Sequence, residues 1–152
     1  MDFPQRKSPR IAGYCYSTPN YYFVTICTHN KACIFGTPGK LNLMGRCAEE
    51  NLLTIPRVYP NVRIDKYVVM PNHVHAIVVI DGEDGAADLC TIVGQYKMTV
   101  TKRIREIAPG QVVWQRSFHD HVIRNQKAYE KIWMYIEGNP LKWEDDCFYV
   151  AQ

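Results

Sequence analysis

The sequence predicts a protein of the α+β class, in which strands and helices follow one another in the order βαββαβ and one more helix comes near the end. Stretches rich in β-branched and aromatic residues alternate with stretches whose apolar residues recur at helical spacing. The chain has 152 residues, of which 47% are hydrophobic, so it can bury one core of ordinary size. We therefore expect a single domain over residues 1–152.

The first residues predict no packed element. Residues 1–20 contain three prolines and show no apolar period, which indicates an N-terminal arm. Residues 21–28, Tyr-Tyr-Phe-Val-Thr-Ile-Cys-Thr, are the first expected strand. Residues 32–35 are expected to pair back as a short hairpin partner.

A first helix is expected to follow this strand. From Leu43 onward the apolar residues recur at helical spacing, with Asn42 as the N-cap and a break or kink at Pro56 near the end. Residues 62–70 and 74–80 are two apolar runs separated by a Pro-Asn turn. They predict an antiparallel hairpin.

The second half repeats the alternation of helix and strand. Residues 81–88 are acidic and lack the ligand spacing of a calcium-binding EF-hand, which is typical of a solvated loop. Residues 89–107 predict a second helix, residues 112–123 a strand, and residues 126–138 a third helix that ends before Pro140. The order matches the ferredoxin-like plan, an antiparallel sheet with helices on one face, plus an additional C-terminal helix.

Composition bears on three questions: nucleic-acid binding, structural zinc sites and membrane association. A formal net charge of +3 neither requires nor excludes nucleic acid as a partner. The six cysteines include no Cys-x-x-Cys pair, which argues against a structural zinc site. No run of about 18 apolar residues is present, so we expect a cytoplasmic protein with reduced thiols and no membrane partner.

Two histidines open the second strand of the predicted hairpin. Because side chains on a strand alternate between faces, His73 and His75 point the same way, with Cα atoms about 6.6 Å apart, while Val74 points into the core. This spacing lets both imidazoles reach one metal ion. Either histidine could equally be a half-buried residue of the sheet, so the pair alone leaves both interpretations open.

The third expected helix carries a tyrosine and an amide four residues apart. Tyr135 and Asn139 therefore lie on one helix face. An asparagine carbonyl can bind a hard divalent ion, and a phenol beside that ion could attack a phosphodiester once charge is withdrawn from its oxygens. The product would be a covalent phosphotyrosine. A tyrosine on a helix is also often structural.

Four strings together resemble the HUH endonucleases, specifically the single-tyrosine transposases of small bacterial insertion sequences and the REP-associated tyrosine transposases. Residues 67–77, Tyr-Val-Val-Met-Pro-Asn-His-Val-His-Ala-Ile, resemble the histidine, hydrophobic, histidine motif of that family. Residues 21–28 resemble its first strand, residues 114–125 the segment before its last helix, and residues 135–140 its nucleophile helix.

The resemblance implies an enzyme that recognises a DNA hairpin and cleaves and rejoins single-stranded DNA through a 5′-phosphotyrosine intermediate. It implies Mg²⁺ or Mn²⁺ bound by His73, His75 and Asn139, with Tyr135 as the nucleophile. In insertion-sequence members the residue four after the tyrosine is usually glutamine, whereas asparagine followed by proline is similar to the REP-associated branch. A mobile element and a domesticated relative both stay open, as do a monomer and a homodimer.

A second alternating group, His119, Asp120 and His121, lies in the last expected strand. We expect it to support the site, through a hydrogen bond to the metal ligands or a DNA contact, with an ordinary sheet histidine as the alternative.

Basic and aromatic residues are the expected DNA contacts. Four cations of the second helix are expected to bind the hairpin backbone, and two arginines flank the second histidine group. These residues are Lys97, Lys102, Arg103, Arg105, Arg116 and Arg124, with Tyr14 and Tyr16 available for base stacking.

Two other functions stay open on the sequence. One is a catalytically silent, domesticated protein that binds hairpin DNA without cutting it. The other is a zinc hydrolase that acts on a small substrate through three nitrogen or oxygen ligands and an open coordination position.

Overall fold

The fold is built on one antiparallel sheet of four strands in the order β4-β5-β1-β6. The computed structural model describes residues 20–82 and 87–152. The strands are β1 (Asn20–Cys27), β4 (Val62–Met70), β5 (His73–Ile80) and β6 (His119–Ile123). This is the strand order of the ferredoxin-like plan, so the predicted fold class is confirmed.

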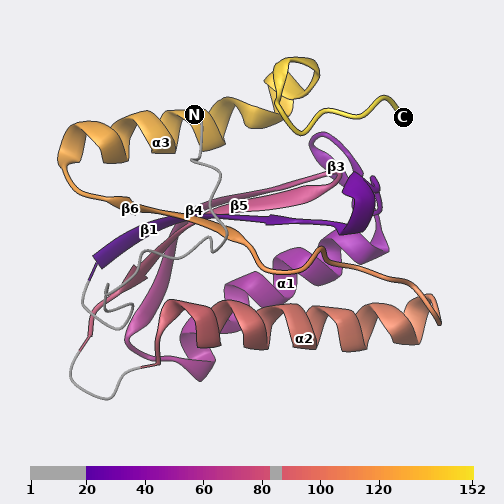
Figure 1. The fold of residues 1–152 in the computed structure, drawn as a ribbon, viewed down its shortest axis with the longest axis horizontal. Helices are drawn as coiled ribbons and strands as arrows, with labels where there is room; N and C mark the ends of the chain where they lie inside the picture. Colours follow the sequence, from indigo (N-terminus) through magenta and orange to yellow (C-terminus); the bar gives the residue numbers. More distant parts are fainter. Residues whose placement is uncertain (1–19, 83–86) are drawn as a thin grey trace.

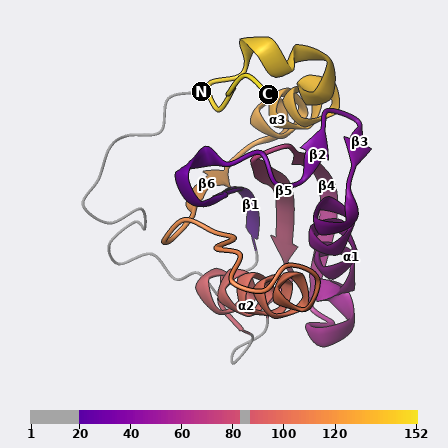
Figure 2. The ribbon, with the colours of Figure 1, turned by 90° about the vertical axis from the view of Figure 1, so that its right-hand side faces the viewer.

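Helices cover both faces of the sheet. The helices α1 (Leu43–Val58) and α2 (Leu89–Ile107) lie on one face, and α3 (Gln126–Gly138) lies across the other (Figures 1 and 2). Each begins at a side chain whose oxygen accepts a hydrogen bond from a backbone N–H of its first turn. The pairs are Asn42 with Gly45, Asp88 with Thr91, and Asn125 with Ala128.

Alternation along the two central strands divides the apolar side chains between two cores. Val24 and Val74 belong to the larger core, which includes residues of α1 and α2. Phe23, Ile77 and Ile136 belong to a smaller core beneath α3. Because helices cover both faces, β5 is buried along its whole length.

Strand β4 contains a bulge at Asp65. Ile64 pairs with Val78 and Lys66 pairs with Ile77, so Asp65 is an extra residue without a partner on β5. A bulge places two neighbouring residues opposite one and re-aims their side chains. Here both Asp65 and Lys66 reach residues of α3.

The structure differs from local predictions at three places. Residues 32–35 form no strand, and the short hairpin lies just after them, between β2 (Gly36–Thr37) and β3 (Lys40–Leu41). The helix α1 continues through Pro56 to Val58, so no break occurs there. The strand expected over 112–123 is regular only in β6, and upstream of it Trp114 makes an isolated bridge with Thr28.

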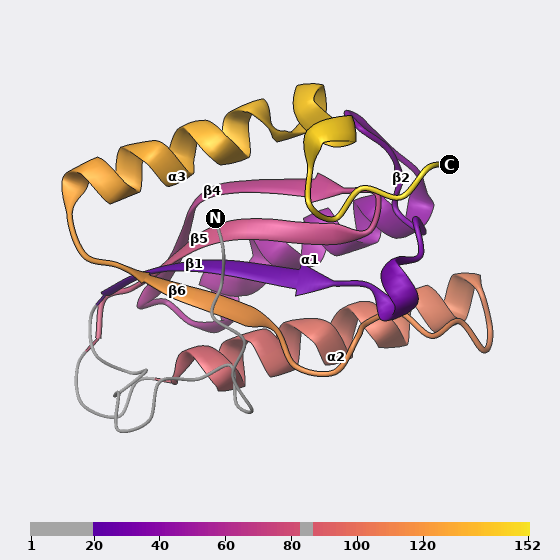
Figure 3. The same ribbon diagram turned by 45° about the horizontal axis from the view of Figure 1, so that its top comes forward.

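The C-terminal segment returns to the sheet. After α3 the chain forms the 3₁₀ helix η2 (Asn139–Asp145) and then passes the turn between β4 and β5 (Figure 3). The side-chain nitrogen of Asn72 in that turn donates to the Phe148 carbonyl over 2.7 Å. The arm expected over residues 1–20 lies outside the described residues except for Asn20, which begins β1. Among the helices in the described part of the chain, none has the length and apolarity needed to cross a membrane.

Candidate active site

Two buried histidines of the central strand β5 lie side by side. His73 and His75 are 0% and 1% exposed, and their ring centroids are 4.5 Å apart. The intervening Val74 packs in the larger core on the opposite face. The alternation of a strand therefore directs both imidazoles to the face that α3 covers.

Hydrogen bonds orient the His73 ring. Its Nδ1 lies 2.8 Å from Oδ1 of Asn72. The side-chain nitrogen of Asn72 donates to the carbonyls of Phe148 and Lys31, which fixes that amide with its oxygen toward the histidine. Since an amide oxygen can only accept, Nδ1 of His73 carries the proton and Nε2 keeps a lone pair. That is the tautomer that binds a metal ion through Nε2.

Three polar atoms at this place are buried and have no hydrogen-bond partner. They are Nε2 of His73, Nε2 of His75 and Oδ1 of Asn139. Burial holds the pKa of both imidazoles below the usual value for histidine, so both rings are neutral at neutral pH. Two neutral imidazoles and an amide oxygen that lack partners fit a divalent cation, because an unpaired buried polar atom otherwise costs free energy.

A carboxylate that the sequence analysis did not assign completes the group. The ligand atoms of His73, His75 and Asp146 lie within 4.8 Å of one another. Asp146 Oδ2 lies 3.9 Å from Nε2 of His73 and accepts a hydrogen bond from the side-chain nitrogen of Asn139 over 2.8 Å. The acidic residues of the tail were visible in the sequence, but no spacing linked Asp146 to the histidines.

The expected nucleophile lies against the same group. The Tyr135 ring centroid is 5.4 Å from that of His75, and the residue is 38% exposed. Partial burial, reinforced by the negative charge of Asp146, raises the pKa of Tyr135 to about 12. The phenol is therefore protonated at neutral pH. The structure thus brings together the four residues that the sequence analysis assigned to the chemistry, His73, His75, Tyr135 and Asn139, within a single chain.

The bulge in β4 fixes the helix that carries Tyr135. Tyr129 donates its hydroxyl proton to Asp65 over 2.9 Å. Lys66 forms an ion pair with Glu137, and its ammonium lies 4.0 Å from the ring centroid of Trp133. Because these contacts span most of α3, they set the position of Tyr135 along the sheet.

The C-terminal segment covers the histidines. The Phe148 ring centroid is 4.6 Å from that of His73 and 5.9 Å from that of His75, and Trp143 lies on the His73 ring at 6.2 Å. A phosphate group cannot contact histidines that are at most 1% exposed unless this segment moves.

The second histidine group is divided between the two faces of the sheet. His119 pairs with Thr25 and His121 with Phe23, so both lie on the face of the candidate site. Asp120 is buried and pairs with Val24, whose side chain belongs to the larger core. Its position does not support the expected hydrogen bond to the metal ligands. Thr25, which no motif identified, lies 2.9 Å from Nδ1 of His75 through its hydroxyl.

Three of the four expected cations of α2 line one groove. Lys97, Lys102 and Arg105 line a groove of about 510 Å³ between α2 and the following segment. Lys97 also donates to the carbonyls of Gln115 and Ser117, so its amine holds that segment. Arg103 lines a different groove, of about 410 Å³, between α1 and α2.

The remaining expected DNA contacts lie outside α2. Arg116 is exposed between the two residues whose carbonyls accept from Lys97, and Arg124 is exposed between β6 and α3. Tyr14 and Tyr16 fall outside the described residues. Arg116 therefore lies near the groove of Lys97, Lys102 and Arg105, whereas Arg103 lines another groove and Arg124 lies beyond β6.

Known proteins are similar to most of this chain. The family described as IS200-like transposases matches residues 47–139. An uncharacterized protein of Haemophilus influenzae is 36% identical in an alignment of 168 positions that covers 95% of this chain and 93% of that protein.

Two solved structures have a similar fold. One is a REP-associated tyrosine transposase bound to a REP hairpin, with a TM-score of 0.63 and 22% identity over 88% of this chain and 73% of that one. The other is a proposed transposase of Deinococcus radiodurans, with a TM-score of 0.55 and 18% identity over 85% of this chain and 95% of that one.

Proposed function

The chain belongs to the family of IS200-like transposases, and from this membership we propose that it cuts and rejoins single-stranded DNA beside a hairpin, with Tyr135 as the nucleophile. One observation carries the proposal. Three buried atoms with lone pairs, two from the histidines of β5 and one from Asn139, lack partners directly beside the Tyr135 phenol. This arrangement suits a cation that activates a phosphodiester for attack by a phenol.

The protein ligands of the cation would be His73 and His75 through Nε2, with oxygen ligands from Asn139 and Asp146. Mixed nitrogen and oxygen ligands are compatible with Mg²⁺ or Mn²⁺. When bound, the ion would withdraw negative charge from the scissile phosphate. The protein itself orients His73 through Asn72, and it holds Tyr135 through the contacts of α3 with the bulge in β4.

The cutting step exchanges one phosphate ester for another. The Tyr135 oxygen bonds to phosphorus while the bond from phosphorus to the 3′ oxygen of the neighbouring nucleotide breaks. The phenol loses its proton, and the departing 3′ oxygen takes one up. The 5′-phosphotyrosine that remains keeps a phosphodiester bond, so a second 3′ hydroxyl can reverse the step and join a strand.

We propose that this chain also recognises a DNA hairpin, because one structural neighbour is a transposase bound to a REP hairpin. The groove with Lys102 and Arg105 is a candidate contact for its phosphates. We also propose that the protein acts without a tyrosine from a second copy. The α3 helix packs on the sheet of its own chain and places Tyr135 beside His75 of that chain.

The proposal is tested with labelled hairpin DNA and Mn²⁺. Wild-type protein should yield an adduct that survives denaturing gel electrophoresis, and EDTA or Tyr135→Phe should abolish it. Tyr59→Phe, at the end of α1 away from the site, is the matched control and should leave the adduct unchanged. If wild-type protein gives no adduct with DNA that it binds, the proposed chemistry is wrong.

A second candidate is a protein that binds hairpin DNA without cutting it. The aromatic cover of Phe148 and Trp143 over His73 favours it, because the candidate site is closed in this conformation. This candidate predicts hairpin binding that weakens steeply with salt and no adduct with any divalent ion. The zinc hydrolase that the sequence left open receives no support from the family membership.

A further inference from the structure

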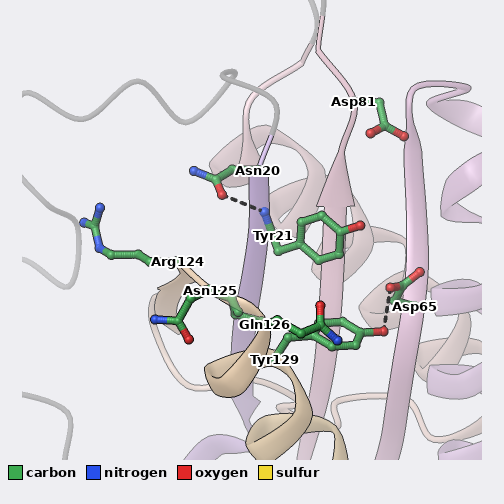
Figure 4. Close-up of a pocket in the computed structure, with 9 residues that line it drawn as sticks. Asn20, Tyr21, Asp65, Asp81, Arg124, Asn125, Gln126 and Tyr129 are labelled. Carbon is green, nitrogen blue, oxygen red and sulfur yellow. Dashed lines mark hydrogen bonds between the residues drawn. The ribbon is translucent and has the colours of Figure 1, made fainter.

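Apart from the candidate active site, a cavity lies at the start of α3, at the opposite end of that helix from Tyr135. It has a volume of about 600 Å³, within the range of small-ligand sites. The start of β1 and the start of α3 form its walls, with Asn20, Tyr21, Arg124, Asn125 and Tyr129 among the lining residues (Figure 4). Nine residues of helix separate Gln126 from Tyr135, which is a rise of roughly 13 Å.

One wall of the cavity carries two carboxylates, Asp65 and Asp81, that share one arginine and so keep a net negative charge. Arg63 binds Asp65 and Asp81, and it donates to the Tyr21 hydroxyl over 3.0 Å. Asp65 also accepts the hydroxyl proton of Tyr129. This network leaves carboxylate oxygens as hydrogen-bond acceptors beside the cavity but supplies no net positive charge, so the wall does not favour a phosphate group.

The other groups at the cavity are aromatic rings and amides. The rings of Tyr21 and Tyr129 meet edge to face, with centroids 5.7 Å apart. The side-chain oxygens of Asn20 and Asn125 accept from the backbone N–H groups of Tyr21 and Ala128. The Asn125 amide is therefore fixed with its NH₂ donor turned away from the backbone. Arg124 is exposed and is the cation among the lining residues of the described chain.

Donors and acceptors beside aromatic rings, with one arginine at the edge, match the chemistry of a nucleotide. Amide and carboxylate groups read the edges of bases through hydrogen bonds. Bases stack on aromatic side chains, and arginine binds the adjoining phosphate. A free anion would instead meet the carboxylates of Asp65 and Asp81.

The edge strand β6 connects this cavity with the candidate active site. His119 and His121 lie on the sheet face that α3 covers, opposite Thr25 and Phe23 of β1. His121 is exposed. Arg124 directly follows β6 and lines the cavity, so this edge strand leads from the His119–Thr25 pair to the cavity.

We propose that the cavity binds one base of the single-stranded DNA that extends from Tyr135, and so selects the sequence on one side of the cut. This inference rests on the proposed function, because it takes single-stranded DNA to be the substrate. It assigns to Asn20, Tyr129 and Arg124 a role in substrate specificity that lies outside the cutting chemistry.

The test compares a blunt-ended DNA hairpin with the same hairpin that carries a single-stranded extension of about ten nucleotides of mixed sequence. Extensions on the 5′ side and on the 3′ side are tested separately. Fluorescence anisotropy would measure the affinity of full-length protein for each. The double variant Asn20→Ala with Arg124→Ala should weaken binding of one extended hairpin by about tenfold, the loss expected for one base contact. Binding of the blunt hairpin should change by less than about twofold.

The matched control removes the same groups from the opposite face. Arg57→Ala in α1 with Gln95→Ala in α2 deletes one exposed arginine and one exposed amide, and this variant should bind both hairpins like wild type. A second measurement avoids substitution of the cavity. The base analogue 2-aminopurine at successive positions of the extension should be quenched strongly at one position, because it stacks on a tyrosine there.

Each result separates this inference from the proposed function. If wild type forms the Tyr135 adduct but the cavity variant binds the extended hairpins like wild type, the cavity assignment is wrong and the proposed function stands. If the cavity variant loses the same affinity for the blunt hairpin as for the extended ones, the cavity assignment is also wrong. Such a loss would mean that the removed groups attract DNA phosphates in general. If the extension-specific loss occurs without any adduct, the cavity assignment stands and the cutting chemistry fails. Wild type that binds neither hairpin overturns both.

Discussion

A divalent ion should raise the thermal stability of this protein through the histidines of β5. Without an ion, the Nε2 atoms of His73 and His75 and Oδ1 of Asn139 are buried without partners. Each such atom costs about 1–3 kcal/mol of folding free energy. An ion that binds the folded state removes this cost and shifts the unfolding equilibrium toward the folded protein.

The size of the effect follows from mass action. At a free ion concentration of one hundred times Kd, the folded state gains about 2.7 kcal/mol. For a chain of this length, 1 kcal/mol shifts the melting temperature by about 2–4 °C. We therefore expect Mn²⁺ to raise Tm by roughly 5–10 °C relative to EDTA, measured by circular dichroism.

Two variants make the measurement specific. His75→Ala removes one ligand and should abolish most of the rise, whereas His121→Ala removes an exposed histidine of β6 and should keep it. Equal melting temperatures in Mn²⁺ and EDTA for wild type would refute the reasoning. A full rise in His75→Ala would refute it as well, because the ion would then bind elsewhere.

Other consequences can be measured separately. Ile136→Ala, in the core beneath α3, should lower the free energy of unfolding by about 2–5 kcal/mol in denaturant titrations; a loss below about 1 kcal/mol would contradict that packing. Lys66→Met should cost about 1 kcal/mol and speed amide hydrogen exchange in α3 more than in α2, since it removes an ion pair and a cation–π contact. Phe148→Ala should increase the yield of the Tyr135 adduct because it uncovers the histidines, and an unchanged yield would mean that the cover does not limit access. Cys27 should react with thiol reagents only on unfolding, since burial raises its pKa to about 12, whereas the exposed Cys90 should react at once.

The parts of the fold that could be predicted depend on local chemistry. Asn42 caps α1 as expected, because a side-chain oxygen before a helical period satisfies a backbone N–H. The segments that form β1, β4 and β5 are rich in β-branched and aromatic residues. Such residues favour strands that are at least half-buried. The shared direction of His73 and His75 follows from the period of a strand alone.

The parts that could not be predicted depend on contacts between distant residues. The residues around Trp114 have strand propensity, but the register with β1 shifts by two residues between the Thr25–His119 pair and the Thr28–Trp114 bridge. Ser117, at a φ of 67°, lies in the interrupted stretch. The bulge at Asp65 leaves no local pattern, because it depends on the register with β5. Asp146 reaches the histidines only because the tail folds back over the sheet, and no sequence spacing encodes that return.

The position of the last residues affects how the protein should be prepared. Gln152 donates from its side chain to the Gly36 carbonyl, and the Phe148 carbonyl is bound by Asn72 next to His73. A purification tag fused after Gln152 would add bulk where these bonds form and would alter the surroundings of the histidines.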